Sequence, residues 1–366
     1  MKFTCEKEIL YNGLAIVSKA ISSRTTHKSL EGILIETYEN GLKLTCTDMT
    51  IGIETKIPAK IAQEGKSLVQ GRIFSEFVRK LPDGEIKFTF EDYNVHIDYG
   101  YSSTNLQTLD YADFPTIPTV EEDNEILIKE DKLRTMITAT VFSAAIEESR
   151  PVLTGALLDI KQNEVKIVCL DGYRLALAKE ILGDNYGDTS IIIPAKTLVE
   201  VQKLLAGNKT IKVYINDSHV QFVTNETKII SRLIEGEFIR YENIIPKEWD
   251  TQIKVDVDEL SKSLDRISTI ANEEGNNTVK MSIYESKLSM STETSLGNIH
   301  EELDIGINGK NLDITFNIRY IIDVLKHLDP EVEMLYFSFT QSTNPCVITP
   351  VDKDDFIYLV LPIRMY

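Results

Sequence analysis

RIFSEFVRKL, residues 72–81, decides the fold because the chain repeats it twice. The copies read KTLVEVQKLL at 196–205 and RYIIDVLKHL at 319–328, about 123 residues apart. Each copy begins with a basic residue, carries a second basic residue seven positions on, and has a leucine two positions further. The recurrence predicts three helices of one kind, in a chain built from one unit used three times.

The composition restricts the class of protein. The chain has 366 residues, 42% of them hydrophobic and 26% charged, with a net charge of -18. Such an acidic chain does not hold nucleic acid by bulk attraction, so any positive charge that meets nucleic acid must be concentrated on one surface. The sequence contains no apolar run of the ~18–20 residues that a membrane helix needs. Because MKFTCEKEIL also lacks the apolar core of a signal peptide, we expect a cytoplasmic protein with no membrane partner.

The cysteines are predicted to be buried free thiols. They stand far apart in apolar, alternating stretches and form no CxxC pair, a pattern that favours packing over disulfide or metal chemistry. The sequence accordingly predicts no metal and no cofactor. The four positions are Cys5, Cys46, Cys169 and Cys346.

Each unit is predicted to open with a short strand and a helix and to continue with a β-hairpin. The opening helices are expected over residues 7–22, 129–145 and 256–271, where apolar residues recur at helical spacing. Alternating apolar runs around short turns predict the hairpins, which pair 32–38 with 42–46, 155–161 with 165–169, and 279–285 with 288–292. After the repeated second helix, chain breakers lead to strands at 85–90, 210–215 and 334–339.

This element order predicts an α+β fold in which two helices pack on an antiparallel sheet in every unit. Polar linkers beside prolines are expected near 121–124 and 247–251. The predicted domains are therefore residues 1–122, 123–248 and 249–366. Three such units in line predict a curved, layered arc.

The basic residues of the repeated helix are predicted to form a stripe. Seven residues make almost two helical turns, so the two basic residues of each copy share a face. A lone pair of this kind is usually a solvated helix face, but three pairs in register favour one shared task, contact with a phosphate backbone. The chain lacks a base-reading motif, so the contact would be independent of sequence, weak, and useful only in a protein that closes around its ligand. The stripe comprises Arg72, Arg79, Lys196, Lys203, Arg319 and Lys326, and the opening helices add Lys132, Lys262 and Arg266.

Five motifs spread over the chain carry a resemblance to a known family. They are RPVLTGALLDI (150–160), LDGYRLALA (170–178), LIEGEFIRYENIIP (233–246), NIRYIIDVLKHL (317–328) and YLVLPIRM (358–365). Over its whole length the chain resembles the bacterial sliding clamp, the beta subunit of DNA polymerase III. The resemblance implies three DNA-clamp domains in a half ring and a head-to-tail homodimer around double-stranded DNA. It also implies a non-catalytic processivity factor that tethers the replicative polymerase.

The resemblance also implies a cleft that binds short linear peptides of the polymerase III alpha subunit, the clamp loader, other polymerases and repair proteins. The family often has histidine where Tyr173 stands and threonine where Leu170 stands, which leaves peptide preference open. Matching positions place in this cleft Leu153, Leu170, Gly172, Tyr173, Arg174, Leu175, Ile239, Ile244, Tyr320, Pro345, Leu359, Leu361, Pro362, Ile363, Arg364 and Met365.

Two further surfaces follow from the resemblance. Arg24 and Arg150 match loop arginines at the ring face and would join the stripe in contacting DNA, although the family's usual TxPIL near the first loop reads THKSLEG here. The ring seam would join the first unit to the third through Phe77, Leu106, Thr269, Ile270, Glu301 and Glu302. Some relatives place arginines opposite these acids, but YGYSSTNL (99–106) has none, so we expect a less ionic seam.

An enzyme and a peptide-binding scaffold are the two alternatives to a clamp. The five histidines are scattered, and the chain has no nucleophile elbow, P-loop or HExxH motif. Asp48 and Asp171 recur in register, but equivalent residues of separate repeats lie too far apart to work as an acid–base pair, so we expect no enzyme. A peptide-binding scaffold without a DNA role is the other alternative, and it requires the stripe to be incidental.

Overall fold

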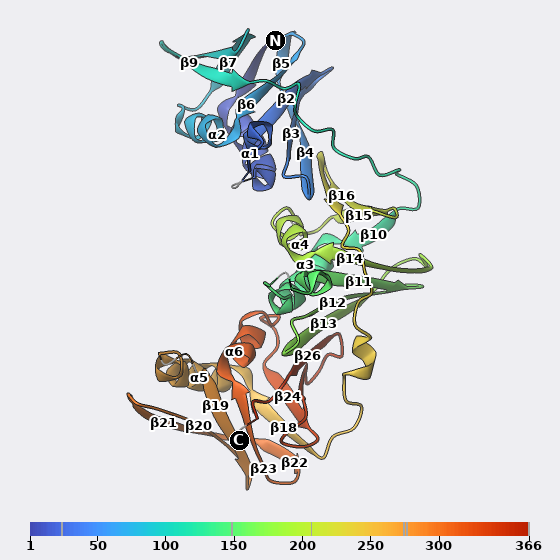
Figure 1. The fold of residues 1–366 in the computed structure, drawn as a ribbon, viewed down its shortest axis with the longest axis vertical. Coiled ribbons are helices and arrows are strands. Elements are labelled where there is room, and N and C mark those ends of the chain that lie inside the picture. The colour runs from blue at the N-terminus through green and yellow to red at the C-terminus, as the bar shows by residue number, and fades with distance from the viewer. Residues whose placement is uncertain (23–24, 148, 206, 274, 276, 365–366) are drawn as a thin grey trace. The chain divides into compact units, whose positions relative to one another are not determined.

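The structure is a computed structural model, and it describes all residues except 23–24, 148, 206, 274, 276 and 365–366 (Figure 1). Contacts between residues divide the chain into two compact units. Unit 1 comprises Met1–Glu130 and Lys203–Leu233, and unit 2 comprises Asp131–Gln202 and Ile234–Tyr366. Each unit is described by itself.

Among the described residues, unit 1 holds one antiparallel sheet of 13 strands, in the order β10-β15-β16-β17-β4-β3-β2-β6-β9-β8-β7-β1-β5. Its strands are β1 (Lys2–Glu6), β2 (Gly32–Tyr38), β3 (Gly41–Thr47), β4 (Ile51–Pro58), β5 (Lys60–Gln63), β6 (Lys66–Gln70), β7 (Glu85–Glu91), β8 (Asn94–Tyr99), β9 (Ser102–Leu109), β10 (Ile126–Lys129), β15 (Thr210–Ile215), β16 (His219–Thr224) and β17 (Thr227–Arg232).

The described part of unit 2 holds a nine-stranded sheet, in the order β14-β11-β12-β13-β26-β25-β24-β18-β22, and a four-stranded sheet, β21-β20-β19-β23. The strands are β11 (Gly155–Lys161), β12 (Glu164–Leu170), β13 (Arg174–Ile181), β14 (Asp188–Pro194), β18 (Thr251–Asp256), β19 (Thr278–Tyr284), β20 (Lys287–Thr294), β21 (Gly297–Asp304), β22 (Gly306–Gly309), β23 (Leu312–Asn317), β24 (Met334–Phe339), β25 (Cys346–Pro350) and β26 (Phe356–Val360).

The strands of the central third are shared between the sheets of the two units. β17 pairs with β4 of the N-terminal third, and β13 pairs with β26 of the C-terminal third. Repeats that alternate apolar residues along every strand can extend a neighbour's sheet, because each exposed edge offers unpaired backbone groups. Both large sheets are therefore built from two thirds of the chain.

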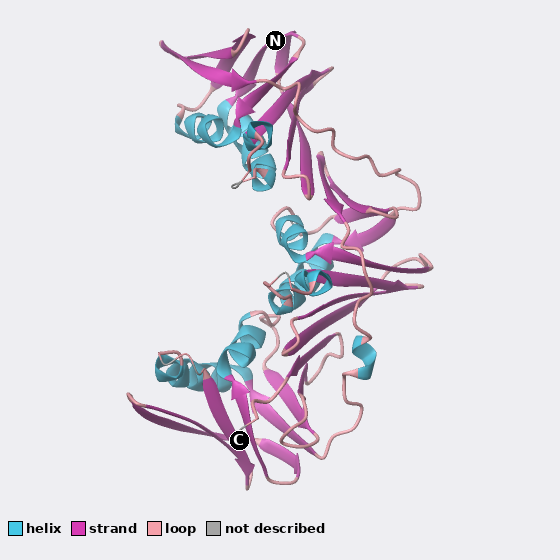
Figure 2. Ribbon diagram, in the orientation of Figure 1, coloured by secondary structure: helices cyan, strands magenta, loops and turns pink. Residues whose placement is uncertain are grey.

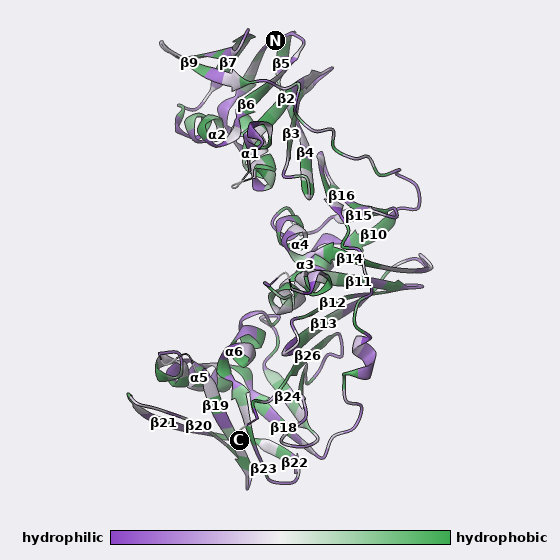
Figure 3. Cartoon of the chain, in the orientation of Figure 1, coloured by the Kyte–Doolittle hydropathy of each residue, from purple (hydrophilic) through white to green (hydrophobic). Residues whose placement is uncertain are grey.

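The helices are α1 (Lys7–Val17), α2 (Gly71–Lys80), α3 (Glu130–Thr140), α4 (Ala195–Gln202), α5 (Val257–Ala271) and α6 (Ile318–Lys326). Within unit 1, α1 and α2 lie side by side on one face of the sheet (Figure 2). Both helices contain hydrophobic and hydrophilic residues (Figure 3), and the apolar ones include the buried Phe74 and Val78 of α2. In α1 the buried side chains include Leu10, Leu14 and Val17, which recur at helical spacing.

The predicted second helices and hairpins are confirmed, and two opening helices are shorter than predicted. α1 ends at Val17 and continues as a 3-10 turn, Ser18–Ala20. α3 ends at Thr140, whose hydroxyl donates to the carbonyl of Met136 at 2.7 Å, and a 3-10 turn, Val141–Ser143, follows. A hydroxyl that bonds the backbone of the preceding turn competes with regular helix, which accounts for this early end.

The recurring aspartates shape turns. Oδ1 of Asp48 accepts hydrogen bonds from the backbone N–H groups of Thr50 and Ile51, at 3.0 and 2.9 Å. Asp171 accepts in the same way from Tyr173 and Arg174, at 2.8 and 3.0 Å. The repeat therefore conserves a turn-forming side chain at this position rather than a catalytic one.

All four cysteines are buried and unpaired, as predicted. Burial raises the pKa of the Cys5 thiol to about 11 and that of Cys46 and Cys169 to about 12. Among the described residues, no helix is long and apolar enough to cross a membrane.

Candidate functional site

The predicted stripe is accessible on the helices. The amphipathic helices turn their apolar sides to the sheets, which leaves the long basic side chains in solvent. Nine of the ten predicted DNA contacts are described, and all nine are exposed: Arg72, Arg79, Arg150, Lys196, Lys203, Lys262, Arg266, Arg319 and Lys326. The tenth, Arg24, lies outside the described residues.

Some of these cations are held by nearby acids. Lys262 pairs with Asp258 one turn away, at 2.5 Å. Arg266 on α5 makes two hydrogen bonds to Glu301 on β21, at 2.6 and 2.8 Å. Arg72 makes no ion pair with any described residue. The stripe is thus uneven in the charge it presents to a ligand.

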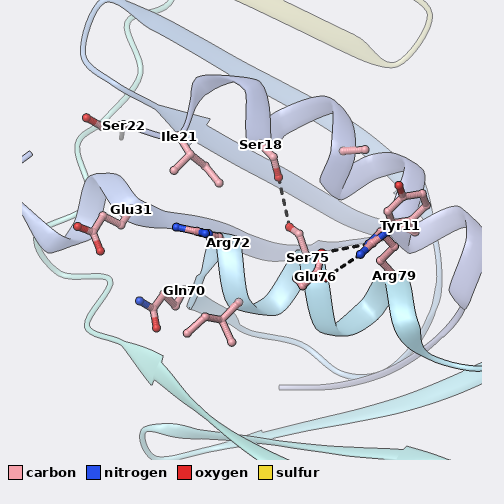
Figure 4. Close-up of a pocket in the computed structure, with 12 residues that line it drawn as sticks. Tyr11, Ser18, Ile21, Ser22, Glu31, Gln70, Arg72, Ser75, Glu76 and Arg79 are labelled. Atoms are coloured by element: carbon pink, nitrogen blue, oxygen red, sulfur yellow. Dashed lines mark hydrogen bonds and ion pairs between the residues drawn. The ribbon is translucent and has the colours of Figure 1, made fainter. Parts of the chain in front are cut away.

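A hollow of ≈ 1120 Å³ lies between α1 and α2 (Figure 4). Ser18 and Ser75 hydrogen-bond across its floor at 3.2 Å. Arg72 and Arg79 both line it. The hollow gives an elongated, charged ligand a concave surface with a guanidinium at each end of α2.

The floor of the predicted peptide cleft is one apolar cluster in unit 2. Four predicted cleft residues are buried in this cluster, three of them on strands β12, β13 and β26 and the fourth in a 3-10 turn, Pro151–Thr154. Predicted cleft residues in this cluster are Leu153, Leu170, Leu175 and Leu359, none more than 4% exposed, with the half-buried Leu361 packed against them. These leucines are core residues that support the cleft from below.

Other predicted cleft residues expose aromatic and apolar groups to solvent. Tyr173 is 61% exposed, and its ring stacks on Tyr320 of α6 with centroids 6.3 Å apart. Ile239 and Ile244 are 36% and 37% exposed. Gly172 has φ +95° and nothing within 4 Å of where a Cβ would stand, so the backbone is open to close approach here.

The C-terminal segment is tied to this region. The backbone N–H of Leu361 donates to the carbonyl of Tyr173 at 2.9 Å, and that of Ile363 donates to Thr315 at 2.8 Å. Pro345 and Pro362 are half-buried and Arg364 is exposed. Met365 lies outside the described residues.

Arg174, which is predicted to line the cleft, is bound by groups of its own chain. Its guanidinium donates to Asp171 at 3.0 Å, to Asp323 at 2.5 Å and to the carbonyl of Phe142 at 2.9 Å. It also lies over the rings of Phe142 and Tyr320, at 5.4 and 4.8 Å from their centroids. With five interactions to four residues and a side chain only 13% exposed, this arginine positions α6 and Tyr320.

Sequence reasoning missed Phe142, Asp323 and Tyr241 as supports of this region. Tyr241 is buried in the same cluster, 3% exposed, and its hydroxyl donates to Asp159 at 3.4 Å. The motif LIEGEFIRYENIIP contained a signal for Tyr241, since an aromatic residue among charged neighbours on a loop needs a buried surface. Nothing local pointed to Phe142 or Asp323.

Among the predicted seam residues, Leu106 lies on β9 and Glu301 and Glu302 lie on β21, whereas the other three lie on α2 and α5. β9 pairs with β8 from Ser102 to Gln107 and with β6 only at Thr108 and Leu109. β21 is the end strand of the four-stranded sheet. Phe77 on α2 packs edge-on against Tyr99, the last residue of β8, with ring centroids 6.0 Å apart.

The acids of the seam are paired within the chain. Glu301 accepts from Arg266, which lowers the pKa of Glu301. Glu302 accepts from Tyr284 at 2.5 Å and from Lys287 at 3.2 Å. Thr269 is exposed, and Ile270 and Leu106 are half-buried.

Comparisons with known proteins agree with this geometry. Models of the DNA polymerase III beta subunit match the chain three times, the N-terminal domain at 1–118, the central domain at 127–239 and the C-terminal domain at 242–364. The beta sliding clamp of Staphylococcus epidermidis is 34% identical, covering 100% of both chains.

Solved structures give the same result. The DNA polymerase sliding clamp of Bacillus subtilis has a TM-score of 0.96 at 33% identity, over 100% of both chains. A putative DNA polymerase III beta subunit from Eubacterium rectale has a TM-score of 0.95 at 32% identity, over 99% of both chains.

The repeated α+β units and their antiparallel sheets are thus those of a DNA sliding clamp, a non-catalytic processivity factor. The chain belongs to the DNA polymerase III beta subunit family.

Proposed function

We propose that two copies of this chain close head to tail into a ring around double-stranded DNA and that the ring tethers the replicative polymerase. One observation carries the proposal: exposed basic residues recur at the same position of α2, α4 and α6 in a chain whose net charge is -18. Cations placed this way suit a phosphate backbone read without regard to sequence. Retention by encirclement makes tight binding unnecessary.

The domains of the half ring are assigned as residues 1–122, 123–248 and 249–366. The three family matches, which start at residues 1, 127 and 242, support this division. Sharing of strands between neighbouring domains, as in the β17–β4 and β13–β26 pairs, stiffens each junction.

The seam is assigned to the edges of β9 and β21. Both strands have eight residues, and each has unpaired backbone groups along an edge. Long open edges invite pairing with another chain. Phe77 and Leu106 beside one edge, and Thr269 and Ile270 beside the other, supply the apolar contact.

The cleft around Tyr173 and Tyr320 is assigned to short linear peptides from the polymerase III alpha subunit, the clamp loader, other polymerases and repair proteins. Apolar walls, an exposed aromatic platform and an open glycine backbone favour an extended peptide with apolar anchors. Arg364, exposed at the rim, supplies the positive charge that Arg174 does not. The cytoplasm, where replication takes place, is the proposed location.

Loading by a clamp loader onto nicked circular DNA, followed by gel filtration, tests the ring. We expect the protein to stay with the circle and to leave when the circle is cut, because a linear duplex has ends. A peptide-binding scaffold without a DNA role binds the polymerase peptide but is not retained on the circle. Peptide binding tests the cleft assignment separately. We expect Met365→Ala and deletion of the last few residues each to weaken binding of a polymerase tail peptide.

A further inference from the structure

An acid recurs beside the basic stripe. Four positions after the first basic residue of each second helix, the chain has Glu76, Glu200 or Asp323. Each acid also stands three positions before the second basic residue, on the helix face that both cations share. This position thus places an acid beside the basic residues of all three helices. The contacts and burial of that acid differ from helix to helix.

On α6 the acid is drawn away from the stripe. Asp323 accepts from the guanidinium of Arg174 on β13 at 2.5 Å. Lys326 is exposed and makes no ion pair within the described part of the chain. On α4 the equivalent acid, Glu200, is turned inward and is only 9% exposed.

On α2 the acid remains on the surface and binds the cations of its own helix. Glu76 accepts two hydrogen bonds from Arg79, Nε to Oε2 at 3.0 Å and Nη2 to Oε1 at 2.7 Å. Nζ of Lys80 lies 3.1 Å from the same Oε1. Figure 4 shows this pairing at the end of the hollow opposite Arg72.

The pairing is bidentate, the geometry in which a guanidinium would otherwise grip a phosphate. These hydrogen bonds, from Arg79 first and Lys80 second, lower the pKa of Glu76 to about 2. The carboxylate is therefore ionised at any physiological pH and competes with DNA continuously.

We propose that Glu76 is a built-in competitor that occupies Arg79 and Lys80 and so weakens the contact of α2 with DNA. The inference rests on the proposed encirclement of DNA. A phosphate reaches Arg79 only by displacing Glu76, which keeps each contact brief. Arg72 at the other end of the hollow stays available, so α2 keeps one ready contact and one restrained contact.

The test is Glu76→Gln, with Glu8→Gln on α1 as its matched control. Both variants remove one negative charge from an exposed helix position of the same unit, but Glu8 makes no ion pair with any described residue. Binding of the free protein to a short linear duplex is measured by fluorescence anisotropy between ~50 and ~200 mM salt.

We expect Glu76→Gln to bind linear duplex about two- to fivefold more tightly at the lowest salt, the range of an exposed ion pair. The slope of log affinity against log salt should steepen by about 1 to 2, one for each released cation. Adding Arg79→Gln to Glu76→Gln should remove most of the gain. Equal affinity and slope in Glu76→Gln and Glu8→Gln overturn the proposal.

Retention on nicked circular DNA separates this proposal from the one it rests on. A wild-type protein that is loaded but not retained overturns encirclement and the role of Glu76 with it. A retained wild type whose Glu76→Gln variant behaves as Glu8→Gln does overturns only the role of Glu76.

Discussion

Arg174 on β13 and Asp323 on α6 are joined by a hydrogen bond of 2.5 Å across 149 residues of sequence. Around it, Arg174 also binds Asp171 and packs on two aromatic rings. Pairs with limited solvent access lose much when one partner is removed, because the other charge stays unpaired. This arginine therefore fixes α6, and with it Tyr320, against β13, which begins directly after Tyr173.

We expect Arg174→Met to lower the free energy of unfolding by about 2 kcal/mol, a value reduced from that of fully buried pairs because Asp323 is partly exposed. Urea unfolding measures it. The matched control is Arg364→Ala, which removes an exposed arginine of the same region and should leave stability within about 0.5 kcal/mol. Equal stability of the two variants contradicts the positioning role.

Tyr173 should dominate peptide affinity. Its exposed ring, supported by Tyr320, has the character of an interface hot spot, so Tyr173→Ala should weaken binding of a polymerase tail peptide about 30-fold, or about 2 kcal/mol. Isothermal titration calorimetry measures the affinity. Ile181→Ala, at the other end of β13 and 60% exposed, should bind as the wild type does. A Tyr173→Ala variant that binds equally well places the peptide elsewhere.

A pair of threonines links the N-terminal and central thirds inside unit 1. The hydroxyls of Thr55 on β4 and Thr227 on β17 lie 2.8 Å apart and are buried. Thr55→Val leaves the other hydroxyl without its partner, so we expect a loss of about 1–2 kcal/mol in unfolding free energy. Changing both residues to valine should recover most of the loss. Additive losses in a double-mutant cycle argue that the bond is not an energetic link.

The seam should respond weakly to salt. β9 contributes no lysine or arginine between Ser102 and Leu109, and the seam acids Glu301 and Glu302 already have partners in their own chain. Exposed charges more than ~10 Å apart are screened at ~0.1 M salt. We expect the dimer dissociation constant to change less than about threefold between ~0.05 and ~0.5 M salt.

Analytical ultracentrifugation gives the dimer dissociation constant. Leu106→Asp, which puts a charge among the apolar contacts, serves as a positive control and should yield monomers. A tenfold or larger weakening of the wild-type dimer by salt shows that ion pairs hold the seam after all.

Alkaline pH should destabilise the fold through its buried thiols. Burial raises the pKa of Cys169 to about 12, whereas an unfolded thiol titrates near ~8.5. As pH rises above that value the unfolded chain loses this proton and the native one keeps it, so stability falls with pH until the native thiol also ionises. Cys169→Ala should flatten the decline in melting temperature between about pH 9 and about pH 11.

The thiols should also be unreactive in the native protein. A thiol reagent at about pH 8 should modify the cysteines only after denaturant is added, because the thiolate is the reactive form and reagent access is blocked. Rapid modification without denaturant contradicts the burial of all four. An unchanged alkaline decline in Cys169→Ala assigns the decline to other groups.

The repeat explains why much of the fold could be predicted from sequence. The repeat predicts each second helix and each hairpin at three equivalent places. Every copy therefore supports the prediction for the other two. Helix ends were less certain, because the end of α3 depends on a hydroxyl bond from Thr140 that periodicity does not encode. The sharing of sheets between thirds followed from no local pattern.

Some features of the candidate site could likewise be predicted from the sequence, and others could not. The buried leucines of the cleft were named because they lie in motifs, and they form one cluster. The contacts of Arg174 could not be predicted, because its partner Asp323 lies 149 positions away in the sequence. Whether Glu76 or a ligand holds Arg79 depends on side-chain conformation, which spacing alone leaves open. The predicted DNA contacts remain proposals, and Arg24 and Met365 lie outside the described residues.

The β17–β4 pairing has a mechanical consequence. A protein that is pulled along DNA must transmit force from one domain to the next. Five residue pairs, Thr227–Ser231 against Ile51–Thr55, connect the N-terminal and central thirds here. The backbone hydrogen bonds of this antiparallel pair are loaded together in shear and share the strain. The polar linker near residues 121–124 therefore bears little force. Force then passes between the two domains through the sheet, and the covalent linker only keeps the domains connected.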